Sequence, residues 1–267
     1  MMEVDKYYVG IDIGSTASKV VVLDQNGMVD KFTIPTGWNG RDAAKAIYQH
    51  LEEKGYCGSS PMTCVATGYG RICVDYADKV VTEITCHGKG GWALFQKECT
   101  IIDVGGQDTK IITVADGQVK DFLMNDKCAA GTGKFIEIMA MRLGTSLDEF
   151  YEMAKKGAPL AISAMCTVFA ESEVISHIGA GEKREDIACG VIHSVAARVA
   201  HLCTRHGITG DVVLTGGLCD SPYFLEILAE KLGKEVVSHP NARYAGALGA
   251  ALTAFRKTSA KASLLQK

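Results

Sequence analysis

The sequence has no long run of charge of one sign and no long hydrophobic run. Its formal net charge is only −3, so nucleic acid is not an expected partner, because chains that bind it usually gather Lys and Arg on one face. No stretch approaches the roughly 18 consecutive apolar residues that a membrane span needs, so no membrane contact is expected. The N-terminal segment MMEVDKYYVGIDIG carries charges where a signal peptide has its apolar core. We therefore expect a cytoplasmic protein.

Cysteines at motif spacing are also missing, although the chain has ten cysteines. There is no C-x-x-C and no Cys/His pair at zinc-finger spacing, which argues against a local zinc site. A disulfide framework is not expected, because the chain carries no secretion signal. Most of the thiols are therefore expected to be small buried hydrophobic side chains.

One segment of the sequence occurs twice in similar form. The segment GIDIGSTASKVVVLDQNGMVDKFTI is followed later by IIDVGGQDTKIITVADGQVKDFLM. At one constant offset, the matching pairs are Asp12 with Asp103, Gly14 with Gly105 and Lys19 with Lys110. Each unit predicts a strand, a glycine turn, a second strand, another turn and a third strand, followed by a helix at 41–54 or at about 130–143. We therefore expect an α/β protein made of two similar halves that face one another.

The two glycine turns, DIGSTASK and DVGGQDTK, suit a bound anion. Backbone amides of such turns point inward and can hold a phosphate, and the hydroxyls of Ser15, Thr16 and Ser18 add donors in the first turn. Asp12 and Asp103 would then lie near a Mg²⁺ carried by that phosphate. The alternative is a pair of ordinary hairpins, but the repeat in register favours phosphate binding.

A third segment, DVVLTGGLCDSPYF, predicts a strand at 212–214, then Gly216 and Gly217, then a helix that begins near Ser221. Two glycines after a strand let a flat ring or a ribose approach the backbone. The later segment NARYAGALGAALTAF predicts a helix of small residues that packs closely on a sheet. After two phosphate turns, this order of elements predicts a nucleoside pocket.

Two cysteines precede predicted helices. In NDKCAAGTGKF, Cys128 stands where a Walker A loop has its first glycine, and Phe135 follows Lys134, so this is not a Walker A loop. In SAMCTVFAESEVIS, Cys166 comes directly before a predicted helix. Amides and the dipole at a helix start favour the thiolate, which is the form that binds iron. Taken without further context, the residues favour two packing positions at helix starts.

In this order, the motifs resemble the actin, Hsp70 and sugar-kinase superfamily, an α/β fold with two duplicated ribonuclease-H-like halves. DIGSTASK, DVGGQDTK, NDKCAAGTGKF, CTVFAESEVISH, TGG and GALGAA together resemble the activator components of 2-hydroxyacyl-CoA dehydratases, in the BadF/BadG/BcrA/BcrD ATPase family, from about residue 7 to 254. We expect a first half at 1–97, completed by the C-terminal helix, a second half at 98–254, and a frayed tail at 255–267.

The resemblance implies an ATP-hydrolysing electron donor that binds ATP or ADP with Mg²⁺. It implies one [4Fe–4S] cluster per homodimer, a ferredoxin or flavodoxin as electron donor, and a 2-hydroxyacyl-CoA dehydratase or a double-cubane iron–sulfur protein as acceptor. The roles that it implies are catalytic for Asp12, Asp103 and Gln107, with Asp108 as the other candidate to orient the water; nucleotide-binding for Gly14, Ser15, Thr16, Ser18, Lys19, Gly105, Gly106, Gly216, Gly217 and Arg243; and cluster-binding for Cys128 and Cys166.

Two other functions remain open. A small-molecule kinase of the same fold would need a carboxylate base beside an open substrate cleft and extra insertions, for which 267 residues are few. An ATP-dependent assembly or regulatory module would need no redox chemistry. Neither function explains the two cysteine motifs.

Overall fold

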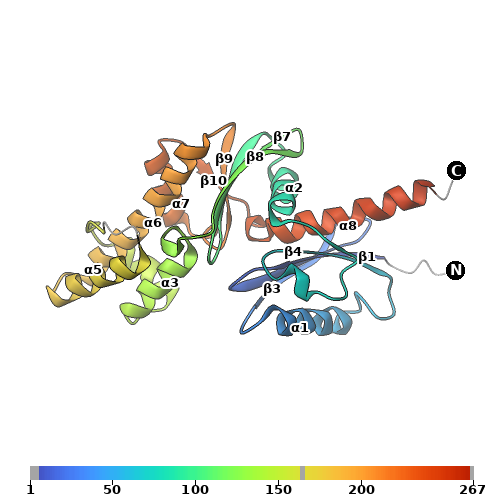
Figure 1. Ribbon diagram of the computed structural model, residues 1–267, viewed down its shortest axis with the longest axis horizontal. Coiled ribbons are helices and arrows are strands. Elements are labelled where there is room, and N and C mark those ends of the chain that lie inside the picture. Colours follow the sequence, from blue (N-terminus) through green and yellow to red (C-terminus); the bar gives the residue numbers. More distant parts are fainter. Residues whose placement is uncertain (1–5, 163–165, 265–267) are drawn as a thin grey trace. The chain divides into compact units, whose positions relative to one another are not determined.

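The computed structural model describes residues 6–162 and 166–264, and these residues form two mixed five-stranded sheets (Figure 1). The chain divides into two compact units. The first contains Met1–Lys97, Val114–Lys120 and Asn241–Lys267, and the second contains Glu98–Thr113 and Asp121–Pro240.

The sheet of the first unit is built around its most buried strand, β1. Across the sheet, the strands are β3 (Met28–Pro35), β2 (Ala17–Leu23), β1 (Tyr7–Ile13), β4 (Met62–Thr67) and β5 (Lys79–Val80). β1 is antiparallel to β2 and parallel to β4, so Asp12 lies between Lys19 and Thr67 in the register. The first phosphate turn is therefore the connection between two paired strands.

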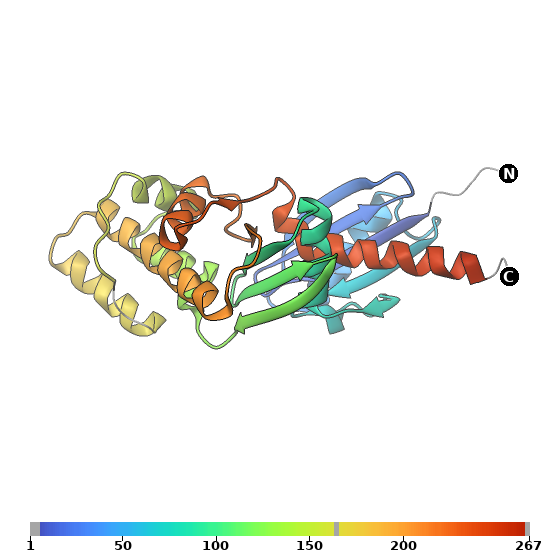
Figure 2. The ribbon, with the colours of Figure 1, turned by 90° about the horizontal axis from the view of Figure 1, so that it is seen from above.

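Helices cover both faces of this sheet because successive strand residues point to opposite sides. Ile11 and Val20 face α1 (Gly40–Glu53), whereas Val21 and Val65 face α8 (Ala245–Leu264). α2 (Glu83–Phe95) packs against α8. Figures 1 and 2 show α8 running along the sheet on the side opposite α1.

α8 approaches the sheet at backbone distance, as its small residues predicted. A Cβ added at Gly10 in β1 would lie 2.0 Å from the carbonyl oxygen of Ala247, and one at Gly90 in α2 would lie 1.8 Å from that of Ala245. Only glycine fits at either position. α8 continues to Leu264, and the expectation of a frayed tail from residue 255 stays a prediction. The segment RKTSAKASL contains no Gly or Pro that would end a helix.

The sheet of the second unit has the order β10-β9-β6-β7-β8. Its strands are β6 (Cys99–Val104), β7 (Thr109–Ala115), β8 (Gln118–Asn125), β9 (Asp211–Gly216) and β10 (Val236–Val237). β6 is parallel to β9, which sets Asp103 opposite Thr215. Residues 114–120, at the tip of the β7–β8 hairpin, belong to the first unit.

The described helices of the second unit are α3 (Gly133–Arg142), α4 (Leu147–Ala154), α5 (Thr167–Gly179), α6 (Arg184–His206) and α7 (Pro222–Leu232). α5 and α7 begin where they were predicted, after Cys166 and near Ser221, whereas α3 begins at Gly133 and not at about residue 130. Short 3-10 turns, η2 (Ala129–Gly131) and η3 (Ala242–Tyr244), precede α3 and α8. Ser221 caps α7, because its hydroxyl accepts a hydrogen bond of 3.3 Å from the amide of Phe224.

α6 is long and apolar enough, by length and composition, to cross a membrane, although its apolar residues do not form an unbroken run. Within the fold, 67% of its most apolar window is buried. It packs against α3, α4 and α7, as the core helix of a globular unit does.

Candidate functional site

Buried hydroxyl groups stabilise the first phosphate turn through hydrogen bonds. The Ser18 and Thr36 hydroxyl oxygens lie 2.9 Å apart, and Thr36 donates a 2.7 Å hydrogen bond to the Gly14 carbonyl. Ser18 is fully buried, so its hydroxyl supports the turn from below, whereas we had expected it to be a phosphate donor. Ser15 is half-buried and Thr16 is exposed, so their hydroxyls are accessible to a ligand.

Asp12 is a buried carboxylate with an unsatisfied oxygen. The residue is 3% exposed, and within the described part of the chain its Oδ1 atom has no hydrogen-bond partner. Gly68, at φ +87°, leaves room for it, because a Cβ there would lie 2.3 Å from Asp12 Oδ1. His87 Nε2 lies 3.9 Å from Asp12 Oδ2. An unpaired buried carboxylate oxygen is costly, so the site suits a cation or its bound water.

Lys19 places its amine over the first turn. The Nζ atom lies 3.3 Å from the point where a Cβ of Gly14 would stand. Lys19 is half-exposed and faces Asp12 across the β1–β2 pair. Its charge is therefore available to a phosphate bound at the turn.

The second turn has a carboxylate that is already satisfied. Asp103 Oδ1 accepts a 2.9 Å hydrogen bond from the Thr215 hydroxyl, and Oδ2 lies 3.4 Å from Lys110 Nζ. Lys110, only 1% exposed, also forms a 2.8 Å ion pair with Asp108. Because Asp108 is engaged by Lys110, the exposed Gln107 is the better placed of the two candidates to orient a water.

The two glycines after β9 differ in accessibility. Gly216 is buried at φ +84°, and a Cβ there would lie 2.9 Å from Asp103 Oδ1. Gly217 is exposed, so of the two it is the one open to a nucleoside. Arg243 lies half-buried in η3, and its contact with the base stays a prediction.

The start of α3 is bonded to the second phosphate turn. The amides of Gly133 and Lys134 donate hydrogen bonds of 3.0 Å each to the carbonyls of Gly105 and Gly106. These helix-start donors have no partner inside α3, so the turn carbonyls satisfy them. A shift of the turn is therefore transmitted directly to the helix.

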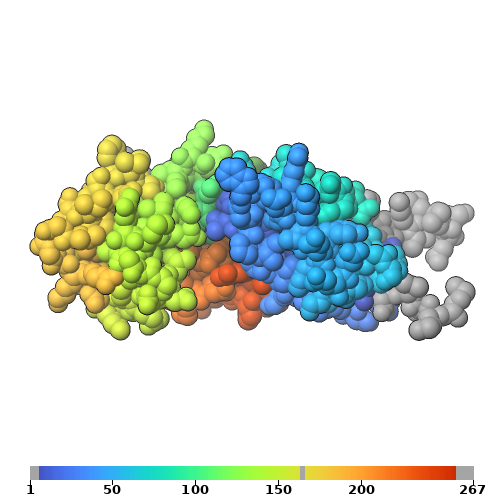
Figure 3. Space-filling view, turned by 90° about the horizontal axis from the view of Figure 1, so that it is seen from below, coloured from blue at the N-terminus to red at the C-terminus, as the bar shows by residue number. Residues whose placement is uncertain are grey.

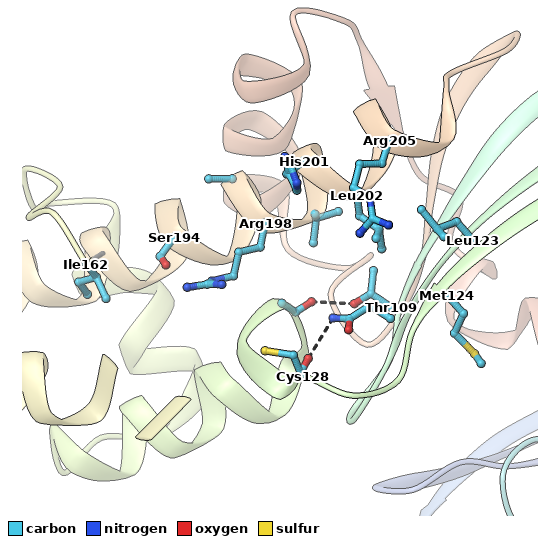
Figure 4. A pocket seen from close by; sticks show the side chains of 14 residues that line it. Thr109, Leu123, Met124, Cys128, Ile162, Ser194, Arg198, His201, Leu202 and Arg205 are labelled. Carbon is cyan, nitrogen blue, oxygen red and sulfur yellow. Dashed lines mark hydrogen bonds between the residues drawn. The ribbon is translucent and has the colours of Figure 1, made fainter. Parts of the chain in front are cut away.

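Two further hydrogen bonds connect the β7–β8 hairpin to the Cys128 segment. The buried Thr109 hydroxyl donates a 2.7 Å hydrogen bond to the Gly131 carbonyl, and the Asn125 amide donates one of 3.0 Å to the Cys128 carbonyl (Figure 4). Cys128 is thus fixed between the end of β8 and the η2 turn. The phosphate turn and this cysteine belong to one hydrogen-bonded assembly.

The cysteines differ in their exposure to solvent. Cys166 is exposed, Cys128 and Cys73 are half-buried, and the buried set is Cys57, Cys64, Cys86, Cys99, Cys189, Cys203 and Cys219. Burial raises the pKa of Cys86 to about 11 and that of Cys203 to about 12, which keeps both as neutral thiols. The accessible thiols of the second unit are those of the two motif cysteines.

The two motif cysteines have different helical settings. Cys166 is the N-cap of α5, as predicted, and its carbonyl accepts a 2.9 Å hydrogen bond from the amide of Ala170. Cys128 caps the short η2 turn, and α3 begins only at Gly133. The predicted helix start is therefore confirmed for Cys166, whereas for Cys128 it was wrong in detail, because α3 begins five residues later.

α5 presents an apolar face beside Cys166. Val168, Phe169 and Ile175 are 65%, 68% and 52% exposed. Arg142 of α3 forms an ion pair with Glu171 of α5, which holds the two helices together. Figure 3 shows α3 (green) and α5 (yellow) beside each other on one face of the second unit.

Sequence reasoning missed His87, Lys110 and Thr215 as site residues. Lys110 had a signal, because it matches Lys19 in the repeat. Thr215 and His87 reach the carboxylates through strand pairing and helix packing across long sequence separations, so no local spacing marked them.

The profile of the BadF/BadG/BcrA/BcrD ATPase family matches residues 9–254. The (R)-2-hydroxyglutaryl-CoA dehydratase activating ATPase of Acidaminococcus fermentans is 43% identical over 256 residues, which cover 95% of this chain and 98% of that protein. The activator of lactoyl-CoA dehydratase of Anaerotignum propionicum is 44% identical over 258 residues, which cover 96% and 100%.

Solved structures of related proteins also resemble this chain. The activator of the 2-hydroxyisocaproyl-CoA dehydratase from Clostridium difficile with bound ADPNP has a TM-score of 0.89 at 38% identity, with 98% of each chain covered. A ROK family glucokinase from Streptomyces griseus, with a TM-score of 0.59 and 14% identity over 94% of this chain and 99% of that one, shares the fold alone. The predicted actin/Hsp70/sugar-kinase-like fold is confirmed.

Proposed function

The chain belongs to the BadF/BadG/BcrA/BcrD ATPase family, and from that premise we propose that it is the ATP-hydrolysing activator of a 2-hydroxyacyl-CoA dehydratase. It delivers low-potential electrons to that enzyme in the cytoplasm. Relatives above 40% identity that carry activator names support the role. The observation that carries the redox part is that Cys128 and Cys166 are the accessible thiols of the second unit, whereas the others described there are buried.

The two phosphate turns bind the phosphates of ATP or ADP. Other backbone amides of the turns around Gly14 and Gly105 bind phosphate oxygens together with the hydroxyls of Ser15 and Thr16, because the Gly14 and Gly105 amides already donate to the carbonyls of Asp12 and Asp108. Lys19, at the first turn, neutralises phosphate charge. Gly106 supports the second turn by holding Lys134 of α3.

A Mg²⁺ ion fits the donor set of the first turn. The unsatisfied Oδ1 of Asp12 would hold the ion, whose positive charge would offset that of the phosphates and the carboxylate. Asp103 contributes negative charge from the second turn, and Gln107 orients the attacking water. The nucleoside lies against Gly217, next to Gly216, and Arg243 is the residue assigned to the base.

The cluster proposal follows from counting ligands. Each copy offers two accessible sulfurs in its second unit, whereas a [4Fe–4S] cluster usually takes four. A homodimer supplies the other two across a two-fold axis. The exposed apolar face of α5 next to Cys166 supports such a contact between copies. When bound, the cluster supplies one-electron transfer at low potential.

Coupling between ATP and the cysteines uses the bonds around the second turn. Closure on ATP moves Gly105 and Gly106, and the bonded amides of α3 follow. Thr109 carries the same movement to Gly131, three residues after Cys128. Hydrogen bonds and solvent near the sulfurs change as a result, and these tune cluster potentials. ATP shifts the population only because it binds one conformer more tightly.

The expected partners are a ferredoxin or flavodoxin as donor and the dehydratase as acceptor. A double-cubane iron–sulfur protein is the alternative acceptor. Mixing reduced activator, ATP and each purified candidate acceptor distinguishes them, because only the true acceptor becomes reduced in step with ADP release.

Anaerobic purification with three serine variants tests the proposal. The parent protein should be a brown dimer with iron and sulfide, and Cys128→Ser and Cys166→Ser should each lose iron and electron delivery. Cys73→Ser is the matched control, because Cys73 is equally half-buried but lies in the first unit. A colourless monomer that hydrolyses ATP would refute the redox role and favour a kinase or an assembly module.

A further inference from the structure

A pocket of about 600 Å³ lies in the second unit beside Cys128. Its walls come from the β7–β8 strands, the Cys128 segment and α6 (Figure 4). Apolar side chains, among them Leu123, Met124 and Leu202, line part of it. The Cys128 side chain is itself a wall residue, so a molecule in the pocket would approach this sulfur from the side of α6.

α6 presents a stripe of basic side chains to the pocket. Arg198, His201 and Arg205 are spaced by three and four residues, so they share one helix face. His201 and Arg205 are exposed, and neither makes an ion pair with the described residues. Arg198 begins close to the η2 turn, because a Cβ at Gly131 would lie 3.5 Å from Arg198 Cβ.

This concentration of positive charge stands out in a chain whose net charge is −3. Arg198 and Arg205 are separated by about 10 Å along the helix axis, which is wider than one small anion spans. An apolar floor with cations along one side is the composition of a protein interface rather than of a phosphate site. The feature therefore fits a macromolecule with several carboxylates.

We propose that this pocket is the docking site of the acidic protein that supplies electrons, whose carboxylates meet Arg198, His201 and Arg205. The inference rests on the proposed function, since it assumes a cluster at Cys128. One electron leaves the reduced flavin or iron–sulfur centre of the donor and is accepted at the Cys128 side, and no bond is made or broken. Opposite charges raise the rate of productive encounter between the two proteins.

Binding and reduction can be measured separately with an acidic flavodoxin as the probe. Calorimetric titration of the cluster-loaded dimer with oxidised flavodoxin gives the dissociation constant, and stopped flow with photoreduced flavodoxin gives the reduction rate. Arg205→Glu should weaken binding and slow reduction by roughly tenfold or more at low salt, Arg205→Gln should do so less, and the difference should shrink at roughly 0.5 M salt.

Two controls isolate docking from folding and from cluster chemistry. Arg41→Glu makes the same charge change at an exposed position of α1 and should leave both readouts at the parent value. Reduction by dithionite needs no docking, so its rate and the iron content should be unchanged in Arg205→Glu.

Three results would overturn the assignment. Parent-like flavodoxin binding by Arg205→Glu would do so, and so would an equal loss in Arg41→Glu. A shift of Arg205→Glu from dimer to monomer would show that a second copy covers the pocket. If the parent protein held no iron yet bound flavodoxin through Arg205, docking would stand and the cluster proposal would fail.

Discussion

The two phosphate turns have matching sequences, but their carboxylates differ in how many hydrogen-bond and ion-pair partners they have. Asp103 is bonded to Thr215 and paired with Lys110. Asp12 occupies the same place in the first repeat, opposite Thr67 on the neighbouring parallel strand, yet its Oδ1 atom lacks a hydrogen-bond partner among the described residues. One half of the repeat is internally satisfied, and the other has capacity left for a ligand.

The origin of the difference is the residue two positions before the matching lysine. In the second turn this is Asp108, which pairs with Lys110 and helps to hold the amine beside Asp103. In the first turn it is Ala17, and the amine of Lys19 lies over Gly14. The two turns are thus similar in sequence, and the difference at this one position accompanies the different placement of the two lysine amines.

The largest expected effect is on the buried lysine. Lys110→Met should lower the free energy of unfolding by about 3–5 kcal/mol, because it leaves the buried Asp103 without its cation, whereas Lys19→Met, at a half-exposed position, should cost under about 1 kcal/mol. Urea unfolding of both variants measures this. The double variant Lys110→Met/Asp103→Asn should recover part of the loss, and equal losses in the two single variants would remove the distinction between the turns.

The next largest effect is expected on ATP hydrolysis, where substitutions of Asp12 and Asp103 should differ. Asp12→Asn should lower kcat for ATP on the order of 100-fold, about 2.7 kcal/mol, and should raise the Mg²⁺ concentration needed for half-maximal rate. Its unfolding free energy should not fall, because the substitution removes the negative charge of a buried carboxylate whose Oδ1 atom has no hydrogen-bond partner among the described residues. Asp103→Asn should lower stability more and should shift the Mg²⁺ requirement less. A parent-like Mg²⁺ titration in Asp12→Asn would rule out the assigned role.

The smallest expected effects distinguish the two buried hydroxyls. Thr109→Val and Ser18→Ala should each cost about 1 kcal/mol of stability. Thr109 bonds to the carbonyl of Gly131, so its loss should also reduce the effect of a non-hydrolysable ATP analogue on iodoacetamide labelling of Cys128 in the cluster-free protein. Ser18 bonds to Thr36, so Ser18→Ala should keep that effect. The coupling route fails if both variants respond like the parent.

The repeat, and the strands and helices that carry it, could be predicted from the sequence. Strand–turn–strand patterns, the helix after Cys166 and the close approach of α8 follow from local residue patterns. The satisfied state of Asp103 and the nearness of His87 to Asp12 depend on strands and helices distant in sequence. Burial of Ser18 depends on Thr36, which belongs to the loop after β3. These features are set by packing, which local spacing does not reveal.

The place of α8 in the first unit sets the order in which the protein can be completed during synthesis. One face of the β1–β4 sheet, including Tyr8, Val21 and Val65, is covered by residues from Ala247 to Ala254. The ribosome makes that stretch after the whole second unit has been made. Until then the older half of the nascent chain keeps an uncovered apolar face, so the first unit closes last although its translation begins first.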